Sequence, residues 1–546
     1  MVTILGMASN RGRNLLNLHR ERPAGASLGV VCSNRADAPI LEAAAEHDIP
    51  AVAVEREPGE DRFSHEERLL DALADYDIDL VCLDGYMRIL SDTFLEAMPP
   101  VLNVHPSLLP AFPGMDAWGD ALAAGVSVSG CTVHVLTDAT NEHGEVIEAE
   151  VDAGPIVTQE PVAVHPDDDR DSLKERILFD GEFAAYPRAV EWITTGVVEI
   201  THEEGSPTIS VTENPDRTFP RQRVGSETRI NMLRYGENPH QEAALYTDGP
   251  VDEPSVVRGD QVGGDRGMSY VNYVDAAGAL DLITEFDRPA AAVIKHANPA
   301  GCATADDLPT AYERALATDP MSAFGGVVAL NRPCDRETAA AIVESVKHVV
   351  VAPGYEEGVL DILGSRESMR VLDVSPDEAR PIGPDDRTEA VAERRLVGGR
   401  LVQDRDRHQL AAEDLEVVTD REPSAEERRS MVFAWHVVKH ATSNAIALAT
   451  GTETVGLGIG QVSRVDAVRL ATMKAAEHAE GKGPDGAVMA SDAFFPFPDG
   501  IEVAGEAGIE AVVQPGGSMR DDAVIDAANE HGMTMAFTGM RCFRHE

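Results

Sequence analysis

The stretch LNVHPSLLPAFPG, residues 102–114, decides how the first part of this chain folds and what chemistry it supports. An apolar strand ends in Asn103 and His105, which are two positions apart and therefore project from the same face. Three prolines then hold an irregular loop at the carboxyl end of the strand, where open parallel sheets bind their ligands. An amide donor beside a histidine suits a reaction in which a carbonyl becomes a tetrahedral oxyanion. Asn103 would donate to the oxygen, and His105 would stabilise it and move a proton.

A carboxylate in the turn DAGP, residues 152–155, completes this set. Asp152 is expected to raise the pKa of His105 by proximity, which gives an Asn, His, Asp constellation. The alternative for the Asn103 and His105 pair is a buried histidine that only caps a loop. That alternative would be preferred if the three prolines were absent.

Strand-like apolar runs alternate with amphipathic segments on both sides of this stretch, over about the first 195 residues. This βαβ rhythm predicts an α/β domain with a mainly parallel, Rossmann-like sheet and helices on both faces. A helix over 171–194 is expected to close the domain. The predicted strands are 2–8, 28–32, 51–54, 80–83, 101–105 and 131–136.

The rest of the chain reads as a linker followed by a second α/β region. Residues 196–228 gather Pro, Gly, Ser and charge and predict the linker. In the region 229–546, a helix is expected near 425–441, where apolar residues recur at helical spacing. The polar segment 376–393 suggests a boundary between two subdomains. No internal repeat is visible in the sequence.

The charge balance is strongly acidic, with 94 Asp and Glu against 46 Lys and Arg and a net charge of -48. This excludes nucleic-acid or membrane binding driven by charge. Hydrophobic residues make up 43% of the chain, so it is expected to fold, and such self-repulsion suits a salt-rich cytoplasm. The six cysteines form no CxxC pair and no apolar stretch reaches 18 residues. Both features indicate a cytoplasmic protein with reduced thiols.

The turn SNRGRN, residues 9–14, leads from the first predicted strand into a helix and is a candidate anion site, although an ordinary turn is the simpler interpretation. With SNRADA (33–38), DGYMRIL (84–90), CTVH (131–134) and VDAGP (151–155), the first 195 residues resemble the glycinamide ribonucleotide formyltransferase family. About eleven residues near 139–150 are extra relative to that family. The resemblance implies that Asn103, His105 and Asp152 are catalytic, that Gly12, Arg13 and Asn14 line the substrate phosphate site, that Arg88, Ile89 and Leu90 hold the pterin of 10-formyltetrahydrofolate, and that Glu182 binds the glycinamide amine.

The run AAAVIKHANPAG places Lys295 and His296 where an apolar strand is expected to stop at a turn formed by Asn298 and Pro299. Lysine is scarce here, with six in the whole chain, so one at the end of a buried run indicates a specific role and not ordinary surface charge. The neighbouring cation would help to keep His296 neutral and able to accept a proton at pH 7. A capped strand end with a lysine that reaches to solvent is the structural alternative.

Further motifs accumulate in this region: RYGENPHQ (234–241), SAFGG (322–326), HATSN (440–444), GQVSR (460–464), SDAFFPF (491–497) and RCFRH (541–545). Together they resemble the 5-aminoimidazole-4-carboxamide ribonucleotide (AICAR) formyltransferase domain of the bifunctional purine biosynthesis protein. The resemblance implies a cytidine-deaminase-like fold of two subdomains, a homodimer and a monovalent cation such as K+. It also implies that Lys295 and His296 are catalytic, that Asn444 orients the formyl group, that Arg234, Tyr235, Arg464 and Arg541 bind the nucleotide, and that Phe494 and His545 complete the pocket.

The sequence therefore predicts a fusion of two folate-dependent formyltransferases of purine synthesis, without a metal ion in the chemistry. The inosine monophosphate cyclohydrolase domain that usually precedes the second family is replaced here by the glycinamide-type domain, so ring closure is not expected. His348 stands where that family commonly has an acidic residue, and SYVN (269–272) replaces its SYNN. Two rival functions remain: hydrolysis of formyltetrahydrofolate by the first domain, and a folate or nucleotide sensor with decayed sites.

Overall fold

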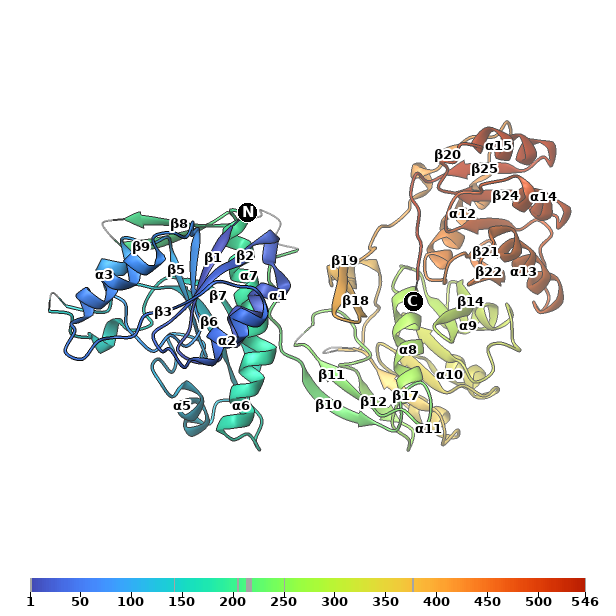
Figure 1. Cartoon of the computed structure of the whole chain (residues 1–546). Helices are drawn as coiled ribbons and strands as arrows, with labels where there is room; N and C mark the ends of the chain where they lie inside the picture. The colour runs from blue at the N-terminus through green and yellow to red at the C-terminus, as the bar shows by residue number, and fades with distance from the viewer. Residues whose placement is uncertain are drawn as a thin grey trace. The chain divides into compact units, whose positions relative to one another are not determined.

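The computed structural model describes residues 2–141, 143–203, 206–212, 219–249, 251–375 and 378–545. The chain divides into two compact units, Met1–Val224 and Gly225–Glu546 (Figure 1). Each unit has its own sheet and its own apolar cores, so each is described separately.

A seven-stranded sheet forms the first unit, in the order β3-β2-β1-β4-β5-β6-β7. The five strands from β3 to β5 run parallel, and β6 and β7 add two antiparallel strands at one edge. The prediction of a mainly parallel α/β sheet is confirmed, and the strand that it missed is β7. The strands are β1 (Thr3–Met7), β2 (Ser27–Ser33), β3 (Ala51–Ala53), β4 (Leu80–Leu83), β5 (Val101–His105), β6 (Val128–Val135) and β7 (Ile156–Ala163).

Helices cover both faces of this sheet because its strands are apolar on both sides. One core contains residues of α1, α2, α6 and α7, and the other contains residues of α3 and α4. The helix predicted over 171–194 is interrupted by a π-helical segment that ends at Glu182. The helices are α1 (Arg13–Glu21), η1 (Pro23–Gly25), α2 (Pro39–Glu46), α3 (Arg62–Leu73), α4 (Asp92–Leu95), α5 (Ala117–Ala124), η2 (Glu148–Glu150), α6 (Arg170–Arg176), η3 (Ile177–Glu182) and α7 (Phe183–Thr194).

The segment predicted as a linker is ordered in its first half. Strands β8 (Val198–Glu203) and β9 (Ser206–Val211) form an antiparallel hairpin there. Val198 is buried in the core of the first unit, and Ile200 and Ile209 pack against that core. The alternating apolar residues of this stretch therefore favour strands more strongly than its Pro, Gly and charged residues favour a linker.

One twelve-stranded sheet runs through the second unit, in the order β12-β17-β16-β15-β13-β14-β22-β21-β23-β24-β25-β20. A separate hairpin pairs β10 with β11, and another pairs β18 with β19. The strands are β10 (Thr228–Leu233), β11 (Ala243–Thr247), β12 (Asp260–Gly263), β13 (Ala290–Lys295), β14 (Asn298–Thr304), β15 (Val327–Leu330), β16 (Val349–Ala352), β17 (Arg370–Asp373), β18 (Val391–Leu396), β19 (Gly399–Asp404), β20 (Glu416–Val417), β21 (Ile446–Thr450), β22 (Glu453–Gly458), β23 (Val488–Ser491), β24 (Ala511–Gln514) and β25 (Thr534–Phe537).

The second unit contains an internal structural repeat that is not visible in the sequence. In each half an edge strand is followed by a helix, a β-hairpin and then three helix–strand pairs, and the halves meet where β14 pairs with β22. The helices of the first half are α8 (Tyr270–Ile283), α9 (Leu308–Leu316), α10 (Arg336–Val343) and α11 (Val359–Gly364). Those of the second half are α12 (Ala425–Val438), α13 (Arg464–Glu477), α14 (Asp499–Glu506) and α15 (Asp521–Glu530), and η4 (Pro384–Asp386) and η5 (Ala412–Asp414) lie between the halves.

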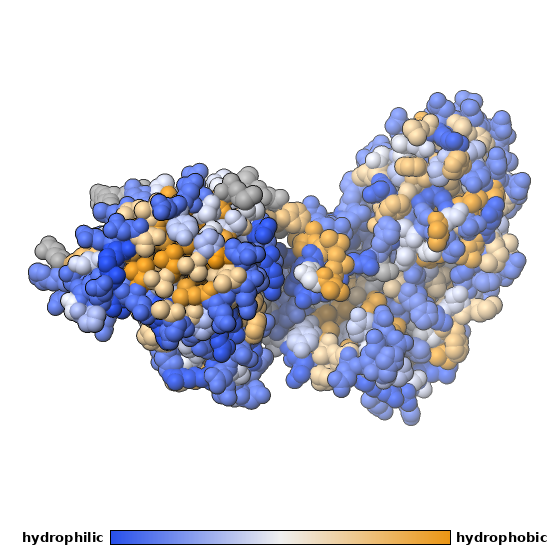
Figure 2. Space-filling model, viewed as in Figure 1, coloured by the Kyte–Doolittle hydropathy of each residue, from blue (hydrophilic) through white to orange (hydrophobic). Residues whose placement is uncertain are grey.

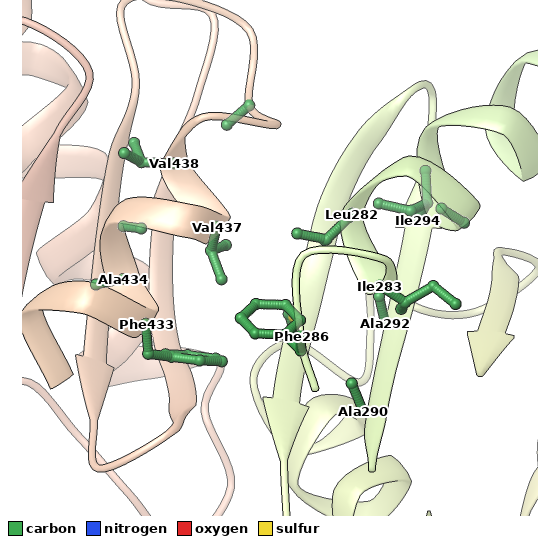
Figure 3. Packing of buried hydrophobic residues seen from close by; sticks show 14 of the residues in the cluster. Leu282, Ile283, Phe286, Ala290, Ala292, Ile294, Phe433, Ala434, Val437 and Val438 are labelled. Carbon is green, nitrogen blue, oxygen red and sulfur yellow. The ribbon is translucent and has the colours of Figure 1, made fainter. Parts of the chain in front are cut away.

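The two halves share a core in which the α8 and α12 regions face each other (Figure 3). The rings of Phe286 and Phe433 lie 5.4 Å apart between their centroids at the centre of this contact. The other face of each half has its own core, beneath α9–α11 in one half and α13–α15 in the other. The two-subdomain α/β architecture predicted for this region therefore takes the form of one continuous sheet.

Hydrophilic residues cover most of the visible surface of both units, and apolar areas interrupt them (Figure 2). This agrees with the expectation that both units are folded, with polar residues outside and apolar residues in the cores. All six cysteines are unpaired and buried. Within the described ranges, no helix is both long and apolar enough to span a membrane.

Candidate active sites

A cavity of about 780 Å³ opens at the carboxyl ends of β1, β4 and β5 in the first unit. This is the edge at which parallel α/β sheets bind ligands. Nearly all of the residues predicted for the first site line it: Gly12, Arg13, Arg88, Ile89, Leu90, Asn103, His105, Asp152 and Glu182. Asn14 lies beside the cavity and donates a hydrogen bond to Glu182, which lines it.

The predicted Asn, His, Asp constellation is assembled in this cavity. His105 Nδ1 lies 3.1 Å from Asp152 Oδ2, and His105 Nε2 lies 3.0 Å from the carbonyl oxygen of Phe112. Asn103 Nδ2 lies 3.1 Å from His134 Nε2, which is itself 3.7 Å from Asp152 Oδ1. Asp152 also accepts a hydrogen bond of 3.3 Å from the backbone N–H of Gly114, which ties it to the proline-rich loop.

The partners of His105 favour its protonated form. Burial alone would lower its pKa, but the hydrogen bond and charge of Asp152 outweigh burial, and the pKa of His105 is raised. The pKa of Asp152 is lowered by the same contact, against the effect of burial. Because both ring nitrogens of His105 face oxygen acceptors, an imidazolium would donate to both of them. Burial lowers the pKa of the neighbouring His134, which favours its neutral form.

Glu182 is buried beside a second carboxylate at the base of the cavity. Asn14 Nδ2 donates to Glu182 Oε2 at 2.6 Å and also to Asp84 Oδ1 at 3.2 Å, so one amide bridges two acids. Burial, followed by the charge of Asp84, raises the pKa of Glu182 to about 7. Burial also raises the pKa of Asp84. Two neighbouring buried carboxylates favour a cationic ligand group such as an ammonium.

The turn after β1 has a conformation that requires glycine. Gly12 has φ +56, and an added Cβ would lie 2.6 Å from Ile40 Cδ1. The backbone N–H of Asn14 is already bonded to Asp84 Oδ2 at 2.8 Å, so it is not free for an anion. Arg13 stacks over the ring of Phe179 with its Cζ 5.7 Å from the centroid. The phosphate-binding roles of Gly12, Arg13 and Asn14 stay predictions.

The extra residues near 139–150 do not prevent the contact between Asp152 and His105. The described part of this insertion forms a tight loop, in which the backbone N–H of Asn141 donates to Glu145 O and Thr140 bridges to Val146. Asp152 follows it with φ +58, a left-handed conformation that aspartate tolerates better than most residues. The insertion therefore forms its own loop ahead of Asp152 in the chain, and the carboxylate of Asp152 still contacts His105.

Lys295 and His296 lie at a tight turn between β13 and β14. The turn residues are His296 and Ala297, with φ +54 and +58, whereas Asn298 and Pro299 begin β14. The turn predicted at Asn298 and Pro299 is therefore wrong by two residues. Asp275 Oδ1 holds the turn by accepting from Ala297 N at 2.7 Å. Lys295 Nζ donates to Phe324 O at 2.9 Å, in the SAFGG motif.

Asn444 and Arg464 lie at the same edge of the sheet and are bonded to each other. Thr442 N donates to Asn298 Oδ1 at 2.9 Å, which joins the HATSN segment to the β13–β14 turn. Arg464 Nη2 donates to Asn444 Oδ1 at 2.6 Å and Arg464 Nη1 to Asp492 Oδ1 at 2.5 Å. Arg464 is thus buried and held by a carboxylate, and it orients the side chain of Asn444.

The remaining predicted residues of the second unit lie on the C-terminal tail and on the segment after β10. Ser443 N donates to Arg544 O at 3.0 Å, so the tail that contains Arg541 and His545 lies against the turn of Asn444. Arg541 and His545 both contact the ring of Phe543. The other predicted residues are Arg234, which stacks on Tyr235 at 5.6 Å, and Phe494, which is half-exposed.

The comparisons with known proteins agree with this division into two units. A sequence model of the AICARFT/IMPCHase bienzyme family matches residues 202–474, half of the chain. The chain belongs to this family. A formyl transferase model matches residues 1–190, so this member of the bienzyme family also has an N-terminal formyl transferase domain.

Several relatives cover only one part of this family member. The bifunctional purine biosynthesis protein PurH of Magnetococcus marinus is 47% identical over 346 residues, which are 62% of this chain and 64% of that protein. The chain thus spans less than two thirds of that relative. Glycinamide ribonucleotide transformylase 1 from Symbiobacterium toebii is 37% identical, with a TM-score of 0.34, over 38% of this chain and 94% of that one. Phosphoribosylglycinamide formyltransferase from Anaplasma phagocytophilum is 33% identical, with a TM-score of 0.33, over 39% and 96%.

Three site residues were missed as site residues by the sequence reasoning. His134 and Asp84 lie within the quoted motifs CTVH and DGYMRIL, but each resembles an ordinary strand or turn residue. Lys174, whose Nζ lies 4.7 Å from the ring centroid of Trp118, also lines the cavity. The small number of lysines in the chain could have drawn attention to Lys174, as it did to Lys295. In the described part of the chain, no cluster of three or more His, Cys, Asp or Glu side chains could hold a metal ion.

Proposed function

We propose that this member of the AICARFT/IMPCHase bienzyme family is a bifunctional formyltransferase of purine synthesis. It would move the formyl group of 10-formyltetrahydrofolate to glycinamide ribonucleotide in the first unit and to AICAR in the second. The observation that carries the proposal is the contact of His105 with Asp152 beside Asn103, in a cavity that Glu182 also lines. That set supplies an oxyanion stabiliser, a proton carrier and an anchor for an amine.

In the first reaction, the amine nitrogen would attack the formyl carbon and form the new C–N bond, while the carbonyl electrons move to oxygen. The amide of Asn103 and the imidazolium of His105 would stabilise this oxyanion. When the carbonyl re-forms, the bond to the folate nitrogen breaks, and the proton lost by the amine reaches that nitrogen through His105. Asp152 keeps His105 oriented and charged, and Glu182 would bind the amine end of the acceptor.

In the second reaction, His296 would accept the proton of the weakly basic aromatic amine as that amine attacks the formyl carbon. Lys295 would stabilise the charge on the formyl oxygen, and Asn444 would orient the formyl group. Arg464 supports this role of Asn444 because it donates a hydrogen bond to the amide oxygen of Asn444 and so fixes the direction of that side chain. The alternative role of Arg464 is a direct contact with the nucleotide, as the resemblance implies.

The decisive experiment measures both activities of the full chain in concentrated potassium chloride. Wild type should formylate both nucleotides, His105→Ala should abolish only the glycinamide reaction, and His296→Ala should abolish only the AICAR reaction. Loss of both activities from either single change would refute the two-site proposal. Formylated AICAR should accumulate without inosine monophosphate, because no ring-closing site is proposed here.

Two rivals make different predictions in the same assay. A formyltetrahydrofolate hydrolase would release formate without any acceptor, and the carboxylate of Glu182 beside His105 favours an amine acceptor over water. A sensor would bind folate or nucleotide and turn over neither. The paired His105 and Asp152 count against a sensor, because binding alone does not need an oriented proton carrier.

The potassium proposal rests on Asp492 in the second unit. This side chain is fully buried and Arg464 occupies its Oδ1, while among the residues that the structure describes its Oδ2 has no hydrogen-bond partner. An unpaired buried carboxylate oxygen is costly, and a bound monovalent cation would offset that cost. Potassium should therefore raise the unfolding temperature of the second unit more than lithium at the same ionic strength, and Asp492→Asn should remove the difference.

We also propose a cytoplasmic homodimer that works in high salt. Exposed aromatic side chains, Phe494, Phe497 and Phe543, lie in the second unit and are of the type that protein interfaces bury. Light scattering in concentrated potassium chloride should give twice the mass of the chain. A monomer under those conditions would refute the dimer.

A further inference from the structure

The turn between α9 and β15, residues 317–326, holds the side chain of Lys295 in the second unit. Lys295 Nζ donates to Phe324 O at 2.9 Å, and Phe324 belongs to the SAFGG motif of this turn. The next residue, Gly325, donates from its backbone N–H to Val346 O at 2.8 Å, which fastens the end of the turn to the segment before β16. The conformation of the turn therefore decides where Lys295 Nζ lies.

Asp319 shapes this turn from its first residues. The side chain of Asp319 is buried, and its Oδ1 accepts from Ser322 N at 3.0 Å while its Oδ2 accepts from Ser322 Oγ at 2.7 Å. The backbone oxygen of Asp319 accepts from Ala323 N at 3.0 Å. Aspartate commonly fixes turns through such bonds to its own following backbone. One carboxylate thus sets the path of the chain up to Phe324.

Two cationic side chains from α13 reach the same carboxylate. Lys474 Nζ lies 3.1 Å from Asp319 Oδ2, and His478 Nδ1 lies 3.3 Å from that oxygen. Burial would raise the pKa of Asp319, but the hydrogen bonds from Ser322, Lys474 and His478 outweigh burial, and the pKa is lowered. Asp319 is therefore held as a carboxylate. Removal of the lysine charge would leave a largely buried anion poorly compensated.

Helix α13 is itself firmly placed on the sheet. An added Cβ on Gly458 would lie 1.9 Å from Ala467 O, so the helix lies directly against β22. Its first residue, Arg464, donates to Asn444, and its last turn contains Lys474. One helix thus contacts Asn444 at its beginning and, near its end, the turn that holds Lys295.

We propose that Lys474 and Asp319 are positioning residues for the formyl transfer to AICAR. Their ion pair holds the turn, the turn presents Phe324 O, and Phe324 O directs Lys295 Nζ to the place where charge develops on the formyl oxygen. This inference rests on the proposed function, because it concerns the role given there to Lys295. A displacement of about 1 Å at a reacting group can cost about a hundredfold in rate, so the pair should affect turnover and not the binding of AICAR.

The first test measures the kinetics of AICAR formylation with the full chain. Lys474→Met and Asp319→Asn should each lower kcat about ten- to a hundredfold and leave the KM for AICAR unchanged. Lys474→Arg should keep most of the wild-type kcat, because it retains the charge. Arg469→Gln is the matched control, because Arg469 pairs with Asp466 on the exposed surface of α13, and it should behave like wild type.

The second test follows Lys295 without turnover. The full chain is acylated with an amine-reactive ester, and mass spectrometry measures the rate at each of its six lysines. Lys295 should react severalfold faster in Lys474→Met and Asp319→Asn than in wild type, because Phe324 O no longer holds its Nζ in place. Lys347 is buried in the same unit and should stay slow in every variant, which shows that the unit remains folded.

The outcomes separate this inference from the proposed function. Unchanged kcat and unchanged acylation of Lys295 in both variants would overturn the inference and leave the function intact. It would also be overturned by a fall in kcat without faster acylation of Lys295, by a raised KM for AICAR with unchanged kcat, or by equal losses in Lys474→Met and Lys474→Arg. If wild type formylated no AICAR, the function would be refuted, and the acylation of Lys295 would still decide whether the pair positions this lysine.

Discussion

Glu182→Gln is expected to stabilise the first unit at alkaline pH while it impairs formylation of glycinamide ribonucleotide. The buried carboxyl of Glu182 has its pKa raised from 4.5 to about 7, so the fold disfavours its charged form. A rise of this size corresponds to about 3 kcal/mol, at about 1.4 kcal/mol for each pKa unit. Glutamine keeps an oxygen for the hydrogen bond from Asn14 and removes the charge beside Asp84.

The sign of the pH dependence follows from the direction of this shift. The folded state binds the proton of Glu182 more tightly than the unfolded state, so wild-type stability falls as the pH rises from about 4.5 to about 7. The variant lacks this titration. It should exceed wild type by about 3 kcal/mol at pH 8.5 and by less than about 1 kcal/mol at pH 5. The buried position means that salt should change the difference little.

Hydrogen exchange of the full chain, followed in peptides from β1, β4 and β5, reports the opening free energy of the first unit alone. Glu191→Gln is the matched control, because Glu191 is exposed on α7 and should change stability by less than about 0.5 kcal/mol. The reasoning fails if Glu182→Gln is no more stable than wild type at pH 8.5. It also fails if the gain is the same at pH 5 and pH 8.5.

Three further changes test other parts of the structure. Gly12→Ala should cost the first unit about 2 kcal/mol in hydrogen exchange, because of its φ of +56 and the crowded Cβ position, and unchanged exchange would contradict this. Asp152→Asn should lower the pKa of His105, measured by NMR, and reduce the glycinamide reaction about a hundredfold or more; an unchanged pKa would show that Asp152 does not hold the charge. Glu285→Gln should cost the second unit about 3–5 kcal/mol in denaturant unfolding, because it leaves buried cations such as Arg387 uncompensated, and a loss under 1 kcal/mol would be inconsistent with a buried network.

The first site was predictable because its residues lie at strand ends that the sequence marks clearly. Asn103 and His105 end an apolar strand before three prolines, and such a pattern permits few other structures. The contact of His134 with Asn103 was not predictable in the same way. It depends on β6 pairing antiparallel with β5 in the register that sets Asn103 opposite His134, and the residues of β6 look like ordinary core.

The internal repeat of the second unit could not be seen because packing, and not residue identity, is repeated. Helix α8 reads YVNYVDAAGALDLI and α12 reads AEERRSMVFAWHVV, and both bury an apolar face against the same shared core. The turn at His296 was misplaced for a related reason. A two-residue turn with both residues left-handed usually contains Asn or Gly, whereas here Asp275 holds His296 and Ala297 in that conformation.

The net charge of -48 sets the conditions under which the second site must bind its substrate. A phosphorylated ligand is repelled at long range, and salt screens that repulsion within a few Å. Several cations of the second unit are buried, among them Lys439, Arg387 and Arg464, so they cannot attract a ligand from solvent. Arg234, which the resemblance assigns to the nucleotide, is exposed, so its charge is available to a ligand at short range. Binding should therefore persist in salt that abolishes long-range attraction, because direct hydrogen bonds to phosphate survive screening that weakens distant charges.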